Sequence, residues 1–185
     1  MNPSLESAGP TLVGLARHII AEALGLPTKA VGIPPWMHSP GASFVTLTID
    51  DQLRGCIGSL TAYRPLVDDI RFNAFAAAFE DPRFYPLTTE EYDKVAVEVS
   101  LLSVPETMPS SSRDQVLSSL RPGIDGVILT SRRGRTTVLP QVWEDYPTPA
   151  EFLDYLLTTA GLKPDYWGND ISIERYHVSI YDEGH

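Results

Sequence analysis

The segment LRGCIG, Leu53 to Gly58, contains the only cysteine of the chain, between two glycines and two positions after an arginine. In an extended strand Arg54, Cys56 and Gly58 point to one face, because side chains alternate between the two faces of a sheet. A guanidinium close to a thiol favours the thiolate, the nucleophilic form of cysteine. Gly58 leaves an opening on that face for a ligand or another backbone. The segment therefore predicts a reactive thiol beside a substrate-binding surface.

A second interpretation of the same segment is structural. Free cysteines are usually small, buried residues, and glycines within a strand often mark a bulge or the close approach of another element. In that case Cys56 belongs to the core and the glycines make room for packing. The residue types alone leave both interpretations open.

Three further polar residues are candidates for the same site. Glu98 lies in the alternating segment VAVEVSLLSV, opposite its valines, and is either part of a solvated face or a carboxylate that moves protons in a cleft. Arg83 follows a helix stop, where it either contributes to function or braces the helix end. With Arg54 and Arg83 holding an anionic substrate and Gln141 also binding it, we expect these side chains to open onto one concavity between the two halves of the chain. We expect Trp143 to be a buried wall of that region.

Other kinds of site have weaker support in the sequence. The four histidines show no metal-ligand spacing with one another or with Cys56, so we expect no metal. The segment GCIGSL lacks the lysine and spacing of a phosphate-binding loop, and no Gly-x-Ser-x-Gly nucleophile elbow is present. We therefore expect no cofactor, and the search for chemistry concentrates on the cysteine.

Composition indicates the class of protein. The 185 residues are 43% hydrophobic and 21% charged, as in ordinary globular proteins, and carry a net charge of −10. This charge argues against binding to nucleic acid or anionic lipid, and we interpret the basic segment SRRGR, residues 131–135, as a hairpin tip. The sequence has neither an apolar run of about 18 residues nor a signal peptide. A single cysteine fits a reducing compartment, so we expect a cytoplasmic protein without a membrane span.

The pattern of apolar residues and turn signals predicts a flexible N-terminus over residues 1–10 and then alternating helices and hairpins. We expect helices over residues 11–26, 64–80, 88–95, 111–120 and 148–162. We expect hairpins over residues 44–60 and 126–144, and strands over residues 95–104 and 171–180.

The order hairpin, helix, strand occurs twice and suggests an internal duplication. An offset of 82 residues pairs Val45 with Val127 and Cys56 with Val138. Consecutive hairpin strands pair in the antiparallel sense. We therefore predict an α+β fold of duplicated β-hairpin–α–β units, with interlocked, mainly antiparallel sheets and an N-terminal helix. We expect residues 11–185 to form one domain of two halves, about 11–109 and 110–185, that do not fold separately.

Several segments together resemble the AMMECR domain family, whose prokaryotic members are called AmmeMemoRadiSam system protein A. The resemblance extends from about residue 11 to residue 181 and rests on FVTL…LRGCIGSL, AFAAAFEDPRFYPLT, VEVSLLSVPE, GVIL…TTVLPQVWE and EFLDYLLTTAGL. One difference is Thr159, where the family more often has lysine.

The resemblance implies a duplicated α+β unit with exchanged strands. It also implies a Memo-type protein and a radical SAM enzyme as partners, but no particular reaction. Combined with the residues, it favours a cytosolic enzyme or enzyme subunit that acts on a small or anionic substrate, with Cys56 as thiolate and Glu98 moving protons. The alternative is a non-catalytic module that binds a ligand or a protein.

Overall fold

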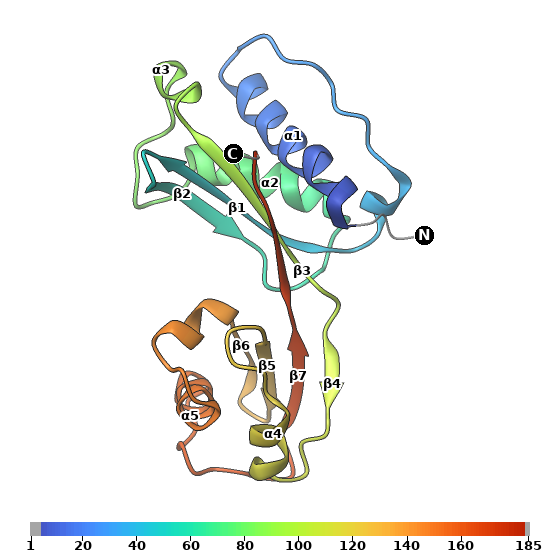
Figure 1. The fold of residues 1–185 in the computed structure, drawn as a ribbon, viewed down its shortest axis with the longest axis vertical. Coiled ribbons are helices and arrows are strands. Elements are labelled where there is room, and N and C mark those ends of the chain that lie inside the picture. The colour runs from blue at the N-terminus through green and yellow to red at the C-terminus, as the bar shows by residue number, and fades with distance from the viewer. Residues whose placement is uncertain (1–4, 184–185) are drawn as a thin grey trace. The chain divides into compact units, whose positions relative to one another are not determined.

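The structure is a computed structural model that describes residues 5–183, shown as a ribbon in Figure 1. The helices are α1 (Leu5–Ala23), α2 (Leu66–Phe79), α3 (Thr89–Tyr92), α4 (Arg113–Ser119) and α5 (Pro149–Thr159), with 3-10 turns η1 (Pro35–His38) and η2 (Pro140–Glu144). The strands are β1 (Ala42–Ile49), β2 (Gln52–Gly58), β3 (Ala96–Leu102), β4 (Glu106–Met108), β5 (Gly126–Ser131), β6 (Gly134–Val138), β7 (Ser172–Tyr176) and β8 (Val178–Tyr181).

The chain forms two compact units, each with its own sheet. Unit 1 contains the described residues up to Leu102 and from Ser179 onward, and unit 2 contains Ser103–Val178. The strand order is β2-β1-β3-β8 in the first sheet and β6-β5-β7-β4 in the second. Strand β3 is thus followed by β4 of the other sheet, and β7 is followed by β8 of the first sheet. Each half of the sequence supplies the last strand of the other half's sheet.

This topology confirms the expected fold class, an α+β chain with antiparallel sheets and an N-terminal helix. The compact units meet at residues 102/103 and 178/179, whereas the expected halves of the sequence meet at 109/110, because β4 and β8 each belong to the other half's sheet. That the two halves do not fold separately stays a prediction.

The N-terminal helix begins earlier than expected. Helix α1 starts at Leu5 and continues through Pro10, so the prediction of a flexible terminus is wrong for residues 5–10, while residues 1–4 lie outside the described part. A proline inside a helix removes one backbone hydrogen bond. Packing offsets this loss, because Ala8 and Leu12 are buried in the core of unit 1.

The first hairpin contains one residue that the second lacks. Strands β1 and β2 are joined through Asp50 and Asp51, both with positive φ, as a two-residue turn requires. Further along, Leu47 pairs with Gly55 and Thr48 with Leu53, so Arg54 is the extra residue of a β-bulge. The β5–β6 hairpin pairs without a shift.

Because of this bulge, the constant offset of 82 residues fails beyond residue 54. Thr46 is opposite Cys56 in the first hairpin, and Ile128, 82 residues after Thr46, is opposite Thr137 in the second. The expected equivalence of Cys56 with Val138 is therefore corrected to Thr137.

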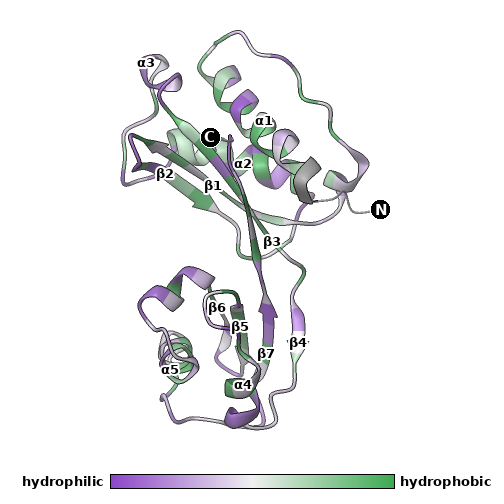
Figure 2. Cartoon of the chain, viewed as in Figure 1, coloured by the Kyte–Doolittle hydropathy of each residue, from purple (hydrophilic) through white to green (hydrophobic). Residues whose placement is uncertain are grey.

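One face of the unit 1 sheet is apolar and is covered by both long helices. Val45, Leu47, Val97 and Val99 alternate along β1 and β3 and are buried in one cluster with residues of α1 and α2. Figure 2 shows hydrophobic residues along both strands. The side chains between them in sequence point to the opposite face of the sheet.

A buried carboxylate joins α2 to β1 and to the residue that follows β2. Asp69, fully buried, accepts hydrogen bonds from the Ser43 backbone N–H and hydroxyl at 2.8 and 2.7 Å and from the Ser59 hydroxyl at 2.6 Å. Arg64 Nε and Asn73 Nδ2 also donate to it, at 2.8 and 3.0 Å. These donors satisfy the charge of a side chain that has no access to water.

We predict that Asp69→Ala costs about 3–5 kcal/mol of unfolding free energy, because it leaves buried donors and the Arg64 guanidinium without their acceptor. Asp69→Asn, which keeps the shape but loses the charge, should cost less. Urea denaturation of both variants measures the difference. The control is Glu80→Ala at the exposed C-cap of the same helix, where we expect a change within about 0.5 kcal/mol. An Asp69→Ala variant as stable as this control would contradict the role of the network.

Candidate functional site

The candidate site lies on the face of the unit 1 sheet that α1 and α2 leave uncovered. Thr46 of β1 is directly opposite Cys56 of β2 and also directly opposite Glu98 of β3. Directly opposed residues of antiparallel strands share a face, so the three side chains form one row with Thr46 in the middle. Thr46 Oγ1 lies 3.4 Å from Cys56 Sγ, within hydrogen-bond distance. The thiol is partly exposed, neither in the core nor fully open to solvent.

Glu98 has an environment that favours its protonated form. Partial burial raises the pKa of Glu98, the negative charge of Asp182 raises it further, and the hydrogen bond from Ser100 at 3.5 Å opposes these effects. A carboxyl group with a raised pKa keeps its proton to higher pH and can then donate it.

The two glycines of LRGCIG have packing roles. A Cβ atom at Gly55 would lie 2.1 Å from the Ala77 carbonyl oxygen, so Gly55 allows the backbone of α2 to approach the sheet. A Cβ atom at Gly58 would lie 2.2 Å from the ring of Phe44, its cross-strand neighbour. The predicted opening at Gly58 is therefore wrong, because the Phe44 ring fills that space.

An ion pair holds the peptide groups of Cys56 at the edge of the sheet. Strand β2 is an edge strand, so Cys56 has no neighbouring strand on its outer side. The Cys56 N–H donates to Asp81 Oδ2 at 2.9 Å, and Arg83 Nη2 donates to the Cys56 carbonyl at 3.1 Å. Arg83 also binds both Asp81 oxygens, at 2.9 and 2.7 Å. The pair thus replaces the missing strand and fixes the backbone beneath the thiol.

The same ion pair places a carboxylate and a guanidinium next to the cysteine. Hydrogen bonds from Arg83 hold the pKa of Asp81 well below its usual range, although the side chain is almost completely buried. The hydrogen bond to Asp81 in turn raises the pKa of Arg83. Both groups therefore stay charged at neutral pH.

Arg54 is held by a second ion pair. Its Nε and Nη2 donate to the two carboxylate oxygens of Glu91 at 2.9 and 3.0 Å. Glu91 also accepts the Thr88 N–H at 3.0 Å, at the start of the helical turn α3. Arg54 Nη1 is buried and has no hydrogen-bond partner. The hydrogen bond from Arg54 lowers the pKa of Glu91 from its ordinary value of 4.5 to about 2.

The structure therefore brings together Arg54, Cys56 and Arg83 at one sheet edge, with Glu98 two strands away on the face of Cys56. Both arginines are already neutralised by carboxylates, which weakens the interpretation that they hold an anionic substrate. Gln141 lies in unit 2, in η2, with an exposed side chain, and its convergence with Cys56 stays a prediction. Trp143 is buried and stacks on Phe152 at 3.9 Å, so its predicted burial is confirmed.

Sequence reasoning missed three residues of this arrangement. Asp81 precedes the proline that ends α2, a position that suggests only a helix stop. Glu91 has the spacing of a helix-capping residue with Thr88, and that signal gives no hint of Arg54. Thr46 is an unremarkable strand residue until strand register places it between Cys56 and Glu98.

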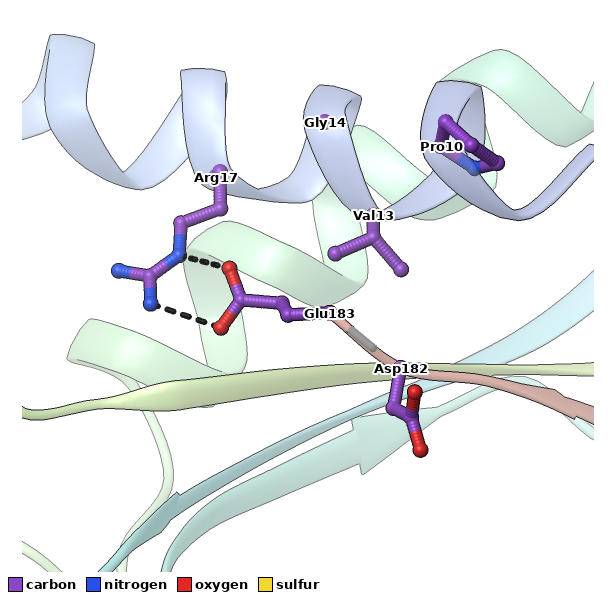
Figure 3. A pocket seen from close by; sticks show the side chains of 6 residues that line it. All are labelled: Pro10, Val13, Gly14, Arg17, Asp182 and Glu183. Carbon is purple, nitrogen blue, oxygen red and sulfur yellow. Dashed lines mark hydrogen bonds and ion pairs between the residues drawn. The ribbon is translucent and has the colours of Figure 1, made fainter. Parts of the chain in front are cut away.

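A separate hollow of about 370 Å³ lies between α1 and the C-terminal segment of unit 1. Figure 3 shows its lining, which includes Val13, Gly14 and Arg17 from α1 and Asp182 and Glu183 after β8. Arg17 pairs with Glu183 and also donates to the Tyr92 carbonyl at 2.9 Å. The guanidinium is thus used in fixing the C-terminal segment to α1, and the candidate site residues do not line this hollow.

Within residues 5–183 no helix is long and apolar enough to cross a membrane. The same range contains no cluster of three or more His, Cys, Asp or Glu side chains arranged to hold a metal ion.

Comparison with known proteins gives a consistent match along almost the whole chain. The sequence matches the AMMECR1 family over residues 13–181. Protein MJ0810 of Methanocaldococcus jannaschii is 38% identical over 180 residues, which cover 95% of this chain and 90% of that protein. A protein of Methanothermobacter thermautotrophicus is 36% identical over 189 residues, covering 98% and 97%.

A solved structure supports the same conclusion. The crystal structure of the uncharacterized protein PH0010 from Pyrococcus horikoshii has a TM-score of 0.75 and 33% identity, and the match covers 97% of this chain and 93% of that chain. The names of these relatives state no activity, so a function must be argued from the geometry.

We predict that Gly58→Ala destabilises the protein because its methyl group meets the Phe44 ring. The cost should be about 1–3 kcal/mol, the usual range for overpacking. A smaller side chain at residue 44 should reduce this steric contact. Phe44→Leu combined with Gly58→Ala should therefore cost less unfolding free energy than the sum of the two single changes. A double-mutant cycle by urea denaturation measures this coupling. Strictly additive costs would show that Gly58 does not make room for Phe44.

The Arg54–Glu91 ion pair predicts a defined pH dependence of stability. The pKa of Glu91 is lower in the folded state than its ordinary value, so the pair's contribution is fully present above pH 4.5 and is lost as the pH falls towards about 2. The difference in unfolding free energy between wild type and Glu91→Gln should therefore shrink across this window. Glu80→Gln controls for the loss of an exposed carboxylate. A difference that stays constant from neutral pH to pH 2 would contradict the prediction.

Proposed function

The chain belongs to the AMMECR1 family, and from the geometry of unit 1 we propose that it is an enzyme, or a subunit of one, that uses Cys56 as a nucleophilic thiol on a small substrate. The observation that carries the proposal is the row of Cys56, Thr46 and Glu98 on the uncovered face of the sheet. A thiol, a hydroxyl and a carboxyl group whose pKa is raised by burial lie at neighbouring positions of three strands and supply a nucleophile, a hydrogen bond to it and a proton donor.

The chemical step is an addition to an electrophilic carbon. The Cys56 thiol loses its proton to solvent and its sulfur forms a bond to the substrate carbon. As the sulfur adds, the π bond between that carbon and its heteroatom breaks and its electron pair moves to the heteroatom. The heteroatom then takes the proton of the Glu98 carboxyl. Thr46 donates a hydrogen bond to the sulfur and so orients it. Water then returns a proton to Glu98.

The two ion pairs support this step by positioning. Asp81 and Arg83 fix the N–H and carbonyl of Cys56, so the thiol projects from a backbone that cannot twist freely. Arg54 and Glu91 fix the bulge two residues earlier. In this proposal the arginines hold the nucleophile's strand, and the substrate need not be an anion.

The partners and compartment of the protein belong to the same proposal. The resemblance of the sequence motifs supports an enzyme that works with a Memo-type protein and a radical SAM enzyme. A partly exposed free thiol is best preserved in a reducing compartment, which supports a cytoplasmic location.

The alternative function is a non-catalytic binding module. A specific observation favours it, namely large aromatic side chains exposed on α2, among them Phe72 and Phe75. The two functions differ in what they require of Cys56, because a binding module needs no reactive thiol.

We predict that iodoacetamide labels Cys56 in the folded protein, with one label per chain by mass spectrometry, because the thiol is partly exposed. Labelling should rise with pH, since only the thiolate reacts. Arg83→Ala removes the hydrogen bond to the Cys56 carbonyl and should change the labelling rate, whereas Arg71→Ala on the outer face of α2 should not. Cys56→Ser should remain folded and take no label. A native protein that resists labelling until urea unfolds it would overturn the proposal and favour a core cysteine.

A further inference from the structure

Helix α2 carries apolar side chains on its outer face as well as on its inner one. Its inner residues, Ile70, Asn73, Ala74 and Ala77 among them, are buried against the sheet and α1. On the outer face Phe72 is 51% exposed and Phe75 is 40% exposed. Surface helices normally present polar residues to water. An outer face built from phenylalanine therefore indicates a surface that another molecule covers.

These rings belong to a larger aromatic patch, which we define as Tyr63, Phe72, Phe75 and Phe79. Tyr63 is 67% exposed. The rings of Phe75 and Phe79 lie 5.1 Å apart. Tyrosine, phenylalanine and arginine are the residue types that contribute most to protein interfaces.

The aromatic patch is held rigid by Arg64. Its guanidinium lies 4.7 Å from the centre of the Tyr63 ring and 4.3 Å from that of Phe72. Arg64 is itself anchored on the buried Asp69 at 2.8 Å. Because the rings are already ordered, little side-chain freedom is lost when another surface covers them.

The charges at the patch are self-complementary. Asp68 and Arg71 form an ion pair at 3.4 Å on the same face of α2, with side chains 52% and 48% exposed. A two-fold axis that crosses α2 between them would place Arg71 of each copy opposite Asp68 of the other, as an isologous contact requires. The rings on either side of this pair would then meet the other copy's aromatic patch.

The net charge of the chain is also consistent with a second copy of the chain binding at this surface. Two copies of a chain with a net charge of −10 repel each other over most of their surfaces. Residues 60–79 contain two arginines and two aspartates, so their net charge is zero. This segment is therefore a surface at which two copies can approach without local repulsion.

From these observations we propose that the chain forms a two-fold symmetric homodimer through the outer face of α2, with reciprocal Asp68–Arg71 pairs at the axis and the aromatic patch beside them. This inference does not depend on the reactivity of Cys56.

Sedimentation equilibrium of the full chain over a range of concentrations tests the proposal. We expect a reversible monomer–dimer equilibrium. Phe75→Glu places a charge in the patch and should weaken dimerisation about tenfold or more, because truncating or charging a central interface residue has at least this effect. Tyr85→Glu, at a 90% exposed aromatic side chain outside the patch, is the matched control and should leave the equilibrium unchanged.

A charge exchange identifies the symmetry. Arg71→Asp alone brings only acidic groups together at the axis and should weaken the dimer about tenfold or more. The double variant Asp68→Arg with Arg71→Asp restores opposite charges across the axis and should recover most of the wild-type affinity. Circular dichroism checks that α2 remains folded in each variant.

A wild-type chain that is monomeric at every concentration would overturn the proposal and leave the patch to a different protein. A dimer that is insensitive to Phe75→Glu would also overturn it, because the contact then uses another surface. A double variant as weak as Arg71→Asp would contradict the two-fold arrangement.

Discussion

The fold of unit 1 depends on the buried carboxylate of Asp69. Its donors come from β1, from the residue after β2, from the loop that precedes α2 and from α2 itself. An unpaired charge in that position would be costly, so the hairpin and the helix can pack in only one way. This fixed packing brings Gly55 against the backbone of α2. The inner face of the hairpin is then filled, and Cys56 points to the uncovered face.

Two arginines of the family motifs form ion pairs with carboxylates of the same chain. Arg83 closes the edge of the sheet at Cys56, and Arg54 ties the bulge to α3 through Glu91. Surface ion pairs usually contribute little to stability. Here each pair fixes backbone that would otherwise be free, an edge strand in one case and an irregular residue in the other. Their value lies in the positioning of the thiol.

The strand exchange links the two halves of the sequence through their sheets. Strand β8 completes the sheet of unit 1, although it follows directly on β7 of unit 2, and β4 has the reverse relationship. Cutting the chain between the repeats would remove the last strand from each sheet. The second hairpin lacks the bulge of the first and has a threonine in the position of Cys56. The chemistry predicted for this chain is therefore confined to one of the two repeats.

The sequence by itself determined the fold class, the hairpins, most of the helices and the family. These features depend on local periodicity, on turn chemistry and on motifs that are contiguous in the chain. It also marked Cys56 and Glu98, because alternation along a single strand is a local property. Only the tertiary structure decided what lies beside them. Strand register placed Thr46 between the two, packing gave the space at Gly58 to Phe44, and Asp81 and Glu91 became partners of Arg83 and Arg54. The family resemblance implied an exchange of strands, but only the structure identified β4 and β8 as the exchanged strands, since pairing between distant strands depends on long-range packing that local patterns do not encode.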